Sequence, residues 1–486
     1  MWGLLTRSVQ FAVRQIPLVL MVWGFAFAFF MYGFLVSDRH WFPYESLVQA
    51  RTAALFIRNR KIMGDGVPEI RASANVSSAD VKQQRMVARE PVEDGDPLLL
   101  TGGEGQFLDY CPEHGCAAVI VQRDGTALQT YPYRPEELTT KRTLAEPYAE
   151  LLHDDSQDTA VFGLAPLANG DLIVVYDFNG TSPYGGGIAR MDRGGHLLWY
   201  RRDYSNHWPK ITPSNEILVI SHKIGATSLP LYGPRHKARI ETLTCASGIL
   251  HDVIRILDLD GNALDEIPIF EALLASPYWS RLVTGADPLR PLMTANLCDP
   301  LHANSVVPVG RELAAKFADV EPDDVLVSLR NLSALAIFGR AGHSLKHLFV
   351  GTFIYQHSAQ VVSGGNVLLF DNFGSSEAGG PSRVLLFDPL TREERTVFPN
   401  KHTPKDLDVF SPFFGNIDIS EDGTRALLTI STAGKAYEIG LADGRILTTF
   451  DNLHDLHTLP QFARSEKPVR YFTQYGVYYM PRYQAH

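Results

Sequence analysis

Short apolar stretches recur along the chain from about residue 97 onward, and turn-forming residues separate them. Leu172–Tyr176 follows an Asn-Gly-Asp turn, Val367–Phe370 follows Gly-Gly-Asn, and Ala426–Ile430 follows Asp-Gly-Thr-Arg. Apolar runs of about four to eight residues between Gly, Asn and Asp are typical of β-strands. The pattern therefore predicts many short strands joined by tight turns.

These strands belong to a longer repeated unit. An inner strand follows a turn, a second strand ends in Asp, and a tight turn leads to an outer strand, as in the stretch from Leu172 to Trp199. Repeats of roughly 40–60 residues with this order are typical of β-propeller blades. We therefore predict an all-β, six-bladed β-propeller. A β-sandwich could use similar strands, but its architecture does not require the same sequence of turns and strands to recur. Irregular loops between Gly233 and Leu301 leave room for a seventh blade.

The segment Ile16–Val36 differs from the rest because it is a run of 21 residues without a charge. At about 1.5 Å per residue, a helix of this length spans roughly the 30 Å hydrocarbon core of a bilayer. The residues that follow do not resemble a signal-peptidase site, so we expect an uncleaved anchor in contact with the lipid bilayer. Arg7 and Arg14 precede the run closely, which favours a single-pass inner-membrane protein with its propeller on the periplasmic or extracellular side.

Three regions follow from these patterns. We expect a tail and transmembrane anchor in residues 1–37, a juxtamembrane helix (Tyr44–Lys61) and polar linker in residues 38–95, and the propeller in residues 96–486. The formal net charge of −10 argues against nucleic acid as a partner. Hydrophobic residues make up 45% of the chain, which is enough for a sizeable core and argues against disorder.

Two cysteines enclose a turn-like loop, which reads Cys111-Pro-Glu-His-Gly-Cys116. This spacing suits a local disulfide in an oxidising compartment. Cys111, His114 and Cys116 also offer zinc ligands, but the sequence has no second CxxC or HxxxH nearby to complete four ligands. Cys245 and Cys298 are candidates for a second bridge.

Three phrases at predicted blade starts are unusually polar: Cys298–Val306 (CDPLHANSV), Val325–Asn331 (VLVSLRN), and Tyr355–Asn372. Histidines just before an inner strand are expected to face the central channel of a propeller near one mouth. There, an arginine offers a fork of donors to sulfate or phosphate oxygens, and a neutral imidazole serves as nucleophile or general acid–base near pH 7. We therefore expect a site for a tetrahedral anion.

The phrases DPLHANSV, DVLVSLRN, QHSAQVVSGGNVLLFDN and PSRVLLFD resemble, in order and spacing, those of the bacterial arylsulfotransferase family. The resemblance covers roughly residues 163–444. It implies a six-bladed propeller that moves a sulfuryl group from a phenolic sulfate ester to another phenol through a sulfated histidine. It also implies that no nucleotide donor and no cofactor is needed, in keeping with a sequence without a P-loop, although a structural calcium ion is compatible with it.

The same resemblance assigns roles to individual residues. It implies catalytic roles for His302, His357 and Arg383, with Arg330 as the alternative sulfate-binding arginine. It further implies that a set of polar neighbours binds substrate or orients the imidazoles, and these are Asn304, Gln356, Arg330, Asn331 and His207.

One position departs from the family pattern. The family's nucleophilic histidine lies after the arginine, but here the comparable stretch Phe410–Asn416 (FSPFFGN) contains no histidine. His402 lies upstream, and His454 and His457 lie downstream, but no motif places any of the three. Either one of these, His302 or His357 is the nucleophile, or the protein binds aryl sulfates without turning them over.

Two main interpretations follow. The first is a nucleotide-independent sulfotransferase whose partners are aryl sulfate and phenol small molecules. The second is a catalytically inactive propeller that acts as a scaffold or subunit of a membrane protein complex. A third, a quinone-dependent dehydrogenase, rests on Gly195–Trp199 alone, without a repeated tryptophan pattern.

Overall fold

The computed structural model describes part of the chain, which divides into two compact units, Met1–Ala54 and Leu55–His486. The described residues are 21–36 (without 22 and 34), 85–88, 98–102, 115–140 (without 124 and 125), 159–178, 186–232 (without 227), 239–244, 248–281, 299–373, 382–451 (without 406, 408, 412, 413, 432 and 433), 454–455, 470–471 and 474–480.

In the first unit, residues 23–33 are helical, as are residues 35 and 36. Large apolar side chains, among them Trp23, Phe27 and Phe30, are exposed along this helix. Within the described residues, no helix has both the length and the apolar character required to cross a membrane. The anchor over residues 16–36 stays a prediction, and the predicted helix Tyr44–Lys61 lies outside the described residues.

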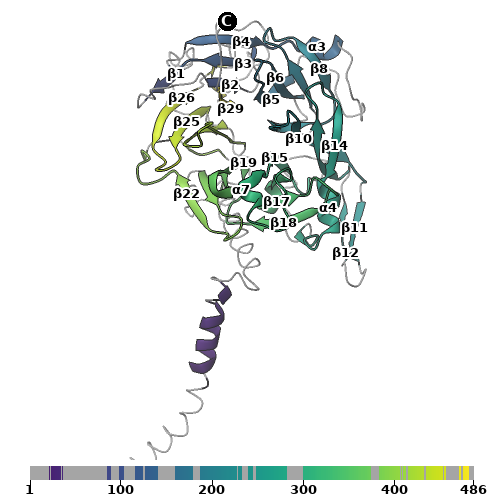
Figure 1. Cartoon of the computed structure of the whole chain (residues 1–486), viewed down its shortest axis with the longest axis vertical. Coiled ribbons are helices and arrows are strands. Elements are labelled where there is room, and N and C mark those ends of the chain that lie inside the picture. The colour runs from purple at the N-terminus through teal and green to yellow at the C-terminus, as the bar shows by residue number, and fades with distance from the viewer. Residues whose placement is uncertain are drawn as a thin grey trace, which may run out of the picture. The chain divides into compact units, whose positions relative to one another are not determined.

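The second unit is a six-bladed β-propeller, as predicted, and Figure 1 shows its blades side by side around a common centre. The first three blades, from the innermost strand outward, are β29 (Gln474–Tyr479), β2 (Leu98–Gly102), β3 (Cys116–Val121) and β4 (Ala127–Pro132); β5 (Thr159–Pro166), β6 (Leu172–Phe178), β7 (Gly187–Met191) and β8 (Leu197–Arg201); and β9 (Asn206–Ile211), β10 (Ile217–Ile224), β13 (Leu250–Leu257) and β14 (Ala263–Pro268).

The other three blades follow in the same order. They are β15 (Ala303–Pro308), β16 (Val325–Leu329), β17 (Ala334–Phe338) and β18 (Leu345–Val350); β19 (His357–Val362), β20 (Asn366–Asp371), β21 (Arg383–Phe387) and β22 (Glu394–Phe398); and β23 (Asn416–Ile419), β24 (Arg425–Ile430), β25 (Lys435–Gly440) and β26 (Ile446–Asp451). The inner strands β5, β9, β15, β19, β23 and β29 contact one another in turn around the ring.

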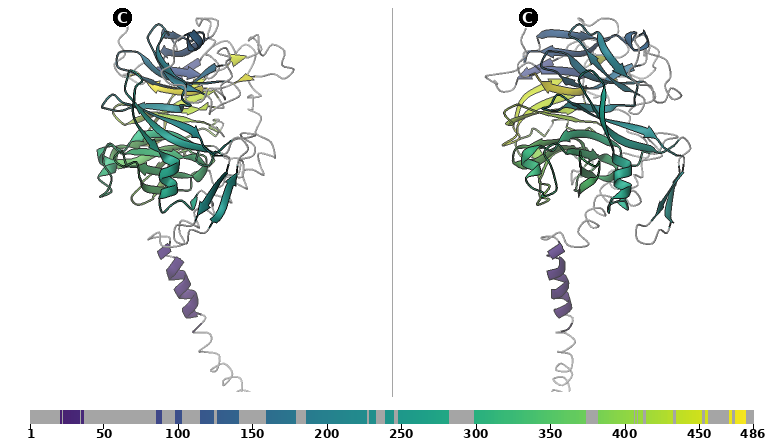
Figure 2. Two further views of the ribbon diagram at one scale, coloured as in Figure 1. Left: turned by 90° about the vertical axis from the view of Figure 1, so that its right-hand side faces the viewer. Right: turned by 45° about the vertical axis from the view of Figure 1, so that its right-hand side comes forward.

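Short elements are added to this frame. They are β1 (Arg85–Ala88), α3 (Glu137–Thr140), β11 (Ser228–Tyr232), β12 (Arg239–Thr244), α4 (Ile269–Ala275), α7 (Gly310–Ala314), η4 (Arg330–Leu332), η5 (Ser363–Gly365), β27 (His454–Asp455) and β28 (Arg470–Tyr471). The two-stranded hairpin β11–β12, which stands out from the propeller in Figure 2, extends with β12 into the stretch from Gly233 to Leu301 that left room for a seventh blade. Among the described residues there are six blades, five with four strands and one that β1 extends to five, and there is no seventh blade.

Aspartates set the turn that leads to the outer strand in several blades. Oδ1 of Asp192 accepts hydrogen bonds from the amides of Gly194 (2.8 Å) and His196 (2.9 Å), and Oδ1 of Asp258 accepts from Asp260 (2.9 Å). A side chain that binds the backbone two residues ahead stabilises a tight turn. This contact explains why the repeated phrase places Asp before the outer strand. The two strands of the phrase that precede this Asp are the second and third of the blade, as β6 and β7 show, and the innermost strand comes before them.

The blades hold together through apolar side chains between adjacent sheets. Leu335 and Phe349 of blade four pack in one buried cluster with Leu369 and Phe387 of blade five. Strands in the middle of a blade are covered on both faces, so their sequences are continuously apolar rather than alternating. Every residue of β16 and β17 is buried.

Two pairings join distant parts of the chain. The C-terminal strand β29 pairs with β2, from Leu98 with Tyr479 to Gly102 with Gln474, and so closes the ring. Strand β1 pairs with the outer strand β26, which places part of the predicted linker against blade six.

Candidate functional site

Three histidines lie where successive inner strands begin. His207 is the second residue of β9, His302 immediately precedes β15, and His357 is the first residue of β19. His207 (φ 58°) and His302 (φ 50°) have left-handed backbone conformations, which residues other than glycine rarely adopt. Such strain persists only where the surrounding structure enforces it, and it often marks a functional site.

The fold brings these three side chains together. The imidazole centroids of His207 and His302 are 5.4 Å apart, and those of His207 and His357 are 6.1 Å apart. One ring nitrogen from each residue lies within 4.8 Å of those of the other two. All three are buried, with 2%, 5% and 2% of their surfaces exposed.

Hydrogen bonds fix which nitrogen of each ring carries the proton. Asn372 donates its amide to the carbonyls of Ser411 (2.7 Å) and Phe414 (2.6 Å), so its Oδ1 is the acceptor that faces His357 Nδ1 at 2.8 Å. Asn206 donates to the Tyr204 carbonyl (3.1 Å), so its Oδ1 accepts from His207 Nδ1 at 2.6 Å.

The third ring follows the same rule. His302 Nδ1 donates to the carboxylate of Asp299, which also accepts the His302 backbone amide at 2.8 Å. A neutral imidazole with a protonated Nδ1 carries its lone pair on Nε2. Because Nδ1 of each ring is engaged by an acceptor, Nε2 is the nitrogen that carries the lone pair when the ring is neutral, and Nε2 of His207 has no hydrogen-bond partner among the described residues.

Burial favours the neutral form of these rings. It is the main cause that lowers the pKa of His207 well below its usual value, and the neighbouring His302, His357 and Arg330 lower that pKa further. Burial and then the charge of Arg330 likewise lower the pKa of His357, although the hydrogen bond to Asn372 opposes them. Both side chains are therefore neutral at pH 7.

Arg330 is the arginine beside the histidines. It begins the short helix η4 and is buried, and its guanidinium carbon lies 4.0 Å from the centroid of the Tyr355 ring. Its Nη1 donates to Asn331 Oδ1 at 3.1 Å, and Asn331 donates in turn to the Asp299 carbonyl at 2.8 Å. We call His207, His302, His357 and Arg330 the histidine centre.

Arg383 is not brought to the histidine centre. It begins β21, where its Nε donates to the buried Asp371 at 2.7 Å and its Nη2 donates to Thr352 at 3.1 Å. Burial raises the pKa of Asp371 and the charge of Arg383 opposes this, so the arginine compensates a buried carboxylate. Of the two arginines considered from the sequence, Arg330 is the one whose charge acts on His207 and His357.

The predicted polar neighbours Asn304 and Gln356 join adjacent blades. Asn304 donates to the Gln356 carbonyl at 2.7 Å, and Gln356 donates to the carbonyls of Leu329 (3.2 Å) and Ala334 (3.0 Å). Their side-chain oxygens have no hydrogen-bond partner within the described part of the chain. Their amide groups thus hold the backbone beside His302 and His357 in place.

Two acidic residues near His302 received no role from the sequence, although Asp299 stands in the quoted phrase. Asp252 accepts the amide of Ala303 at 2.8 Å, next to His302. Burial, and then the proximity of Asp299, raise the pKa of Asp252. Two close carboxylates resist carrying two full negative charges, so the raised pKa of Asp252 favours its neutral form beside the Asp299 carboxylate that contacts His302.

An aromatic cluster of Phe162, Trp208 and Phe414 adjoins the histidines. The ring of Phe162 lies 5.4 Å from His207 and 5.2 Å from Phe414, and Trp208 lies 6.3 Å from His357. Phe414 (φ 58°) precedes β23 in the same left-handed conformation as His207 and His302. Phe414 lies in the stretch where the sequence lacks the family's histidine. Its position before the start of a blade is the only feature of the sequence that points to a place beside the histidines.

The other candidate residues lie apart or outside the description. His402 is exposed in a turn, where its amide donates to Asn400 Oδ1 at 2.8 Å. His454 lies in β27, and His457, Cys111, Cys245 and Cys298 lie outside the described residues. Cys116 is buried at the start of β3, and its bridge to Cys111 stays a prediction.

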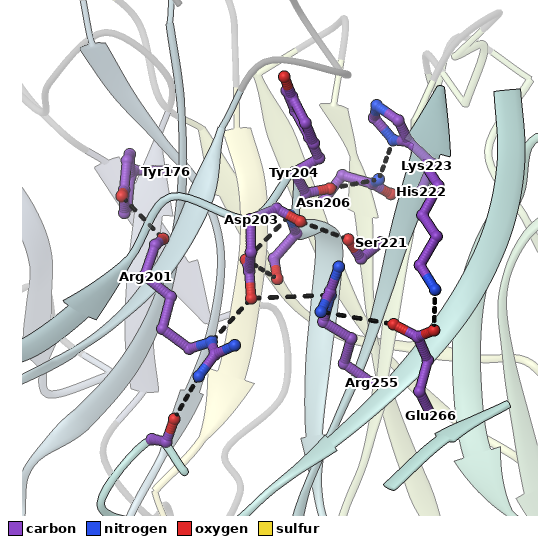
Figure 3. Close-up of polar contacts among 12 residues, drawn as sticks. Tyr176, Arg201, Asp203, Tyr204, Asn206, Ser221, His222, Lys223, Arg255 and Glu266 are labelled. Atoms are coloured by element: carbon purple, nitrogen blue, oxygen red, sulfur yellow. Dashed lines mark hydrogen bonds and ion pairs between the residues drawn. The ribbon is translucent and has the colours of Figure 1, made fainter. Parts of the chain in front are cut away.

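A polar network behind His207 supports the start of β9 (Figure 3). Arg201 donates to the buried Asp203 at 2.8 Å, and Arg255 lies 3.7 Å from the same carboxylate. The backbone carbonyl of Asp203 accepts from Ser221, and three residues later Asn206 accepts from His207 Nδ1. These contacts tie blades two and three together, and the hydrogen bond from Asn206 to the Tyr204 carbonyl holds Asn206 in the orientation that sets the His207 proton.

The fold and this centre define a six-bladed propeller that gathers buried histidines and an arginine at the starts of its inner strands. The model of the arylsulfotransferase (ASST) family matches residues 163–452, so the chain belongs to the arylsulfotransferase family. The match contains every residue of the histidine centre.

Other comparisons are weaker. No curated protein matches the chain. A Bacteroides caccae protein of unknown function is 12% identical, with a TM-score of 0.41 over 73% of this chain and 93% of that one. Virginiamycin B lyase from Staphylococcus aureus is 10% identical, with a TM-score of 0.32 over 60% and 72%. These structural likenesses carry no argument about function.

Proposed function

We propose that the histidine centre transfers sulfuryl groups from aryl sulfate esters to phenols, with His302 as the nucleophile. The observation that carries this proposal is the convergence of three buried imidazoles, whose protonated Nδ1 atoms are all held from outside, beside the buried Arg330. Neutral imidazoles offer lone pairs for attack and proton transfer, and a guanidinium suits sulfate oxygens.

Asp299 distinguishes His302 from the other two histidines. When His302 Nε2 attacks sulfur, an N–S bond forms, the S–O bond to the aryl ring breaks, and its electron pair leaves with the phenolate. The imidazole ring then carries positive charge, and the Asp299 carboxylate that accepts from Nδ1–H offsets it. His207 and His357 are held by neutral amide oxygens and lack this stabilisation.

The second half-reaction restores the centre. The oxygen of the acceptor phenol bonds to sulfur, the N–S electron pair returns to His302, and the phenolic proton passes to Nε2 of His357 and from there to solvent. Arg330 holds the sulfuryl oxygens in both steps. The aromatic cluster of Phe162, Trp208 and Phe414 provides apolar rings against which the phenol can pack.

A transfer assay tests this proposal. With 4-nitrophenyl sulfate as donor and phenol as acceptor, we expect phenol-dependent release of nitrophenolate, lowered about 1,000-fold or more in His302→Ala and unchanged in the exposed control His402→Ala. In a donor-only sample, peptide mass spectrometry should find sulfate on His302. Sulfate on another histidine contradicts the nucleophile assignment. Aryl sulfate binding without turnover supports the inactive scaffold instead.

We also propose that residues 16–36 anchor the chain in the inner membrane, with the propeller in an oxidising compartment where Cys111 and Cys116 form a bridge. The uncharged 21-residue run and the close spacing of the cysteines support this arrangement. Protease treatment of spheroplasts tests it, because a periplasmic propeller is degraded while the membrane stays intact. Protection of the propeller until lysis contradicts it.

A further inference from the structure

A histidine that serves only for packing has both polar nitrogens satisfied or one of them in water, and His207 has neither arrangement. It is 2% exposed, and its Nε2 has no hydrogen-bond partner among the described residues. A buried polar atom left in this state costs about 1–3 kcal/mol. A ligand that accepts the lone pair of Nε2 removes this cost.

The outer contacts of all three rings match those of metal-ligating histidines. In such sites the nitrogen that does not bind metal donates its proton to a carboxylate or carbonyl oxygen, which fixes the ring and its tautomer. Here the acceptors are Asn206 Oδ1, the Asp299 carboxylate and Asn372 Oδ1. Two of these acceptors have their orientation fixed by further hydrogen bonds of their own amide groups.

We propose that His207, His302 and His357 bind a divalent transition metal, represented by Zn²⁺, through their Nε2 atoms. Imidazole nitrogens suit zinc and its neighbours, whereas calcium and magnesium prefer oxygen ligands. Three protein ligands leave a fourth position for water or an anion. Arg330 lies beside the histidines, so it favours an anion there, and the Asp299 carboxylate compensates part of the added positive charge.

The spacing requires a modest closure of the rings. Zinc–nitrogen bonds of about 2.0–2.1 Å place the nitrogens of a tetrahedral site roughly 3.3 Å apart. The ring nitrogens here lie within 4.8 Å of one another, so the largest separation must shrink by at most about 1.5 Å. Rotation of the imidazoles about their side-chain bonds can supply this movement without a change in the inner strands.

Metal binding has a consequence for catalysis that rests on the proposed function. A metal on the three Nε2 atoms occupies the lone pairs needed for sulfuryl and proton transfer. Zinc is therefore expected to inhibit transfer reversibly, and a chelator to restore it. The binding itself is measurable without any aryl sulfate, so the metal proposal and the proposed function can fail separately.

Cobalt titration of the full-length chain, purified without a histidine tag and stripped with chelator, tests the site. We expect one Co²⁺ per chain, visible bands of tetrahedral cobalt, and displacement by one equivalent of Zn²⁺. His207→Ala should weaken binding at least 100-fold, and the exposed control His402→Ala should leave it unchanged. Absence of tetrahedral cobalt bands in the wild type, or full binding by a folded His207→Ala, overturns the proposal.

A second variant separates ligation from a general loss of structure. Asp299→Asn keeps an acceptor oxygen beside His302 but removes its charge, and we expect a 10–100-fold loss of zinc affinity with an unchanged circular dichroism spectrum. Unaltered affinity in a folded Asp299→Asn contradicts the role assigned to the His302 contact. The wild-type cobalt spectrum decides the main proposal even if a histidine variant fails to fold.

Discussion

Histidines lie at the starts of the inner strands of blades three to five. On the neighbouring aromatic side lie Phe162 of blade two and Phe414, which leads into blade six. The two sides share a backbone feature, because His207, His302 and Phe414 all have left-handed conformations. The fold therefore sets where these side chains lie, and their chemical type decides what each side does. We interpret the histidines as the reactive side and the aromatic residues as an apolar surface against which the ring of the phenol can pack.

The largest expected effect separates the two candidate arginines. Arg330→Gln should lower kcat/KM about 100–1,000-fold, because the sulfuryl oxygens lose their charged donor. Arg383→Gln should change kcat/KM less than about twofold but destabilise the fold, because buried Asp371 loses its partner. Kinetics and urea unfolding of both variants measure these changes. A large fall in kcat/KM in Arg383→Gln, with little change in Arg330→Gln, would assign the sulfate-binding role to Arg383.

The aromatic side is expected to show its effect in stability. Phe162 is buried, and truncation of such a ring removes apolar contacts and leaves a cavity, so Phe162→Ala should lower the free energy of unfolding by about 3 kcal/mol. Denaturant unfolding measures this change. If Phe162→Ala instead loses transfer activity at full stability, the aromatic side takes part in substrate binding more directly than the comparison holds.

The contact between His302 and Asp299 gives a smaller effect on the reactive side. In Asp299→Asn the charge that stabilises a sulfated His302 is gone while an acceptor remains, so kcat should fall about 10–100-fold. Steady-state kinetics measure this, and KM should change little. A fall confined to KM would place Asp299 in substrate binding rather than in support of the nucleophile.

The smallest effect concerns the docking of two histidine blades. Arg340 of blade four donates to Glu216 of blade three at 2.8 Å and lowers the Glu216 pKa. A carboxyl group whose pKa is lower in the folded state than in the unfolded state adds stability at pH values above its unfolded pKa. This stability is lost as the pH falls through the folded pKa. Wild type should therefore be more stable than Glu216→Gln by less than about 1 kcal/mol at pH 7, and the two should converge at a pH below the folded pKa of Glu216. Urea unfolding at both pH values checks this, and an equal difference at both contradicts the assignment.

The repeated phrases of the sequence predicted the propeller because each turn is locally encoded. Asp192 and Asp258 bind the backbone two residues ahead, so a short motif carries the whole turn. The pairings of β29 with β2 and of β1 with β26 join segments hundreds of residues apart, and no local pattern specifies them.

The candidate site was predictable to the extent that motifs place side chains at strand starts. His302 and His357 lie where their phrases predict, and His207 joins them as its position before an inner strand suggested. Arg383 contacts Asp371, a partner that its place near a family motif does not reveal. Asp299 and Phe414 depend on contacts across blades, which spacing along one chain does not reveal.

The closing strand β29 has a consequence for the synthesis of the protein. It supplies the innermost strand of blade one from residues 474–479 of a 486-residue chain. Until β29 has been synthesised, one edge of β2 is unpaired, and unpaired strand edges invite aggregation. A nascent chain therefore carries this open edge until residues 474–479 have emerged, and a premature stop codon before residue 474 leaves the ring open.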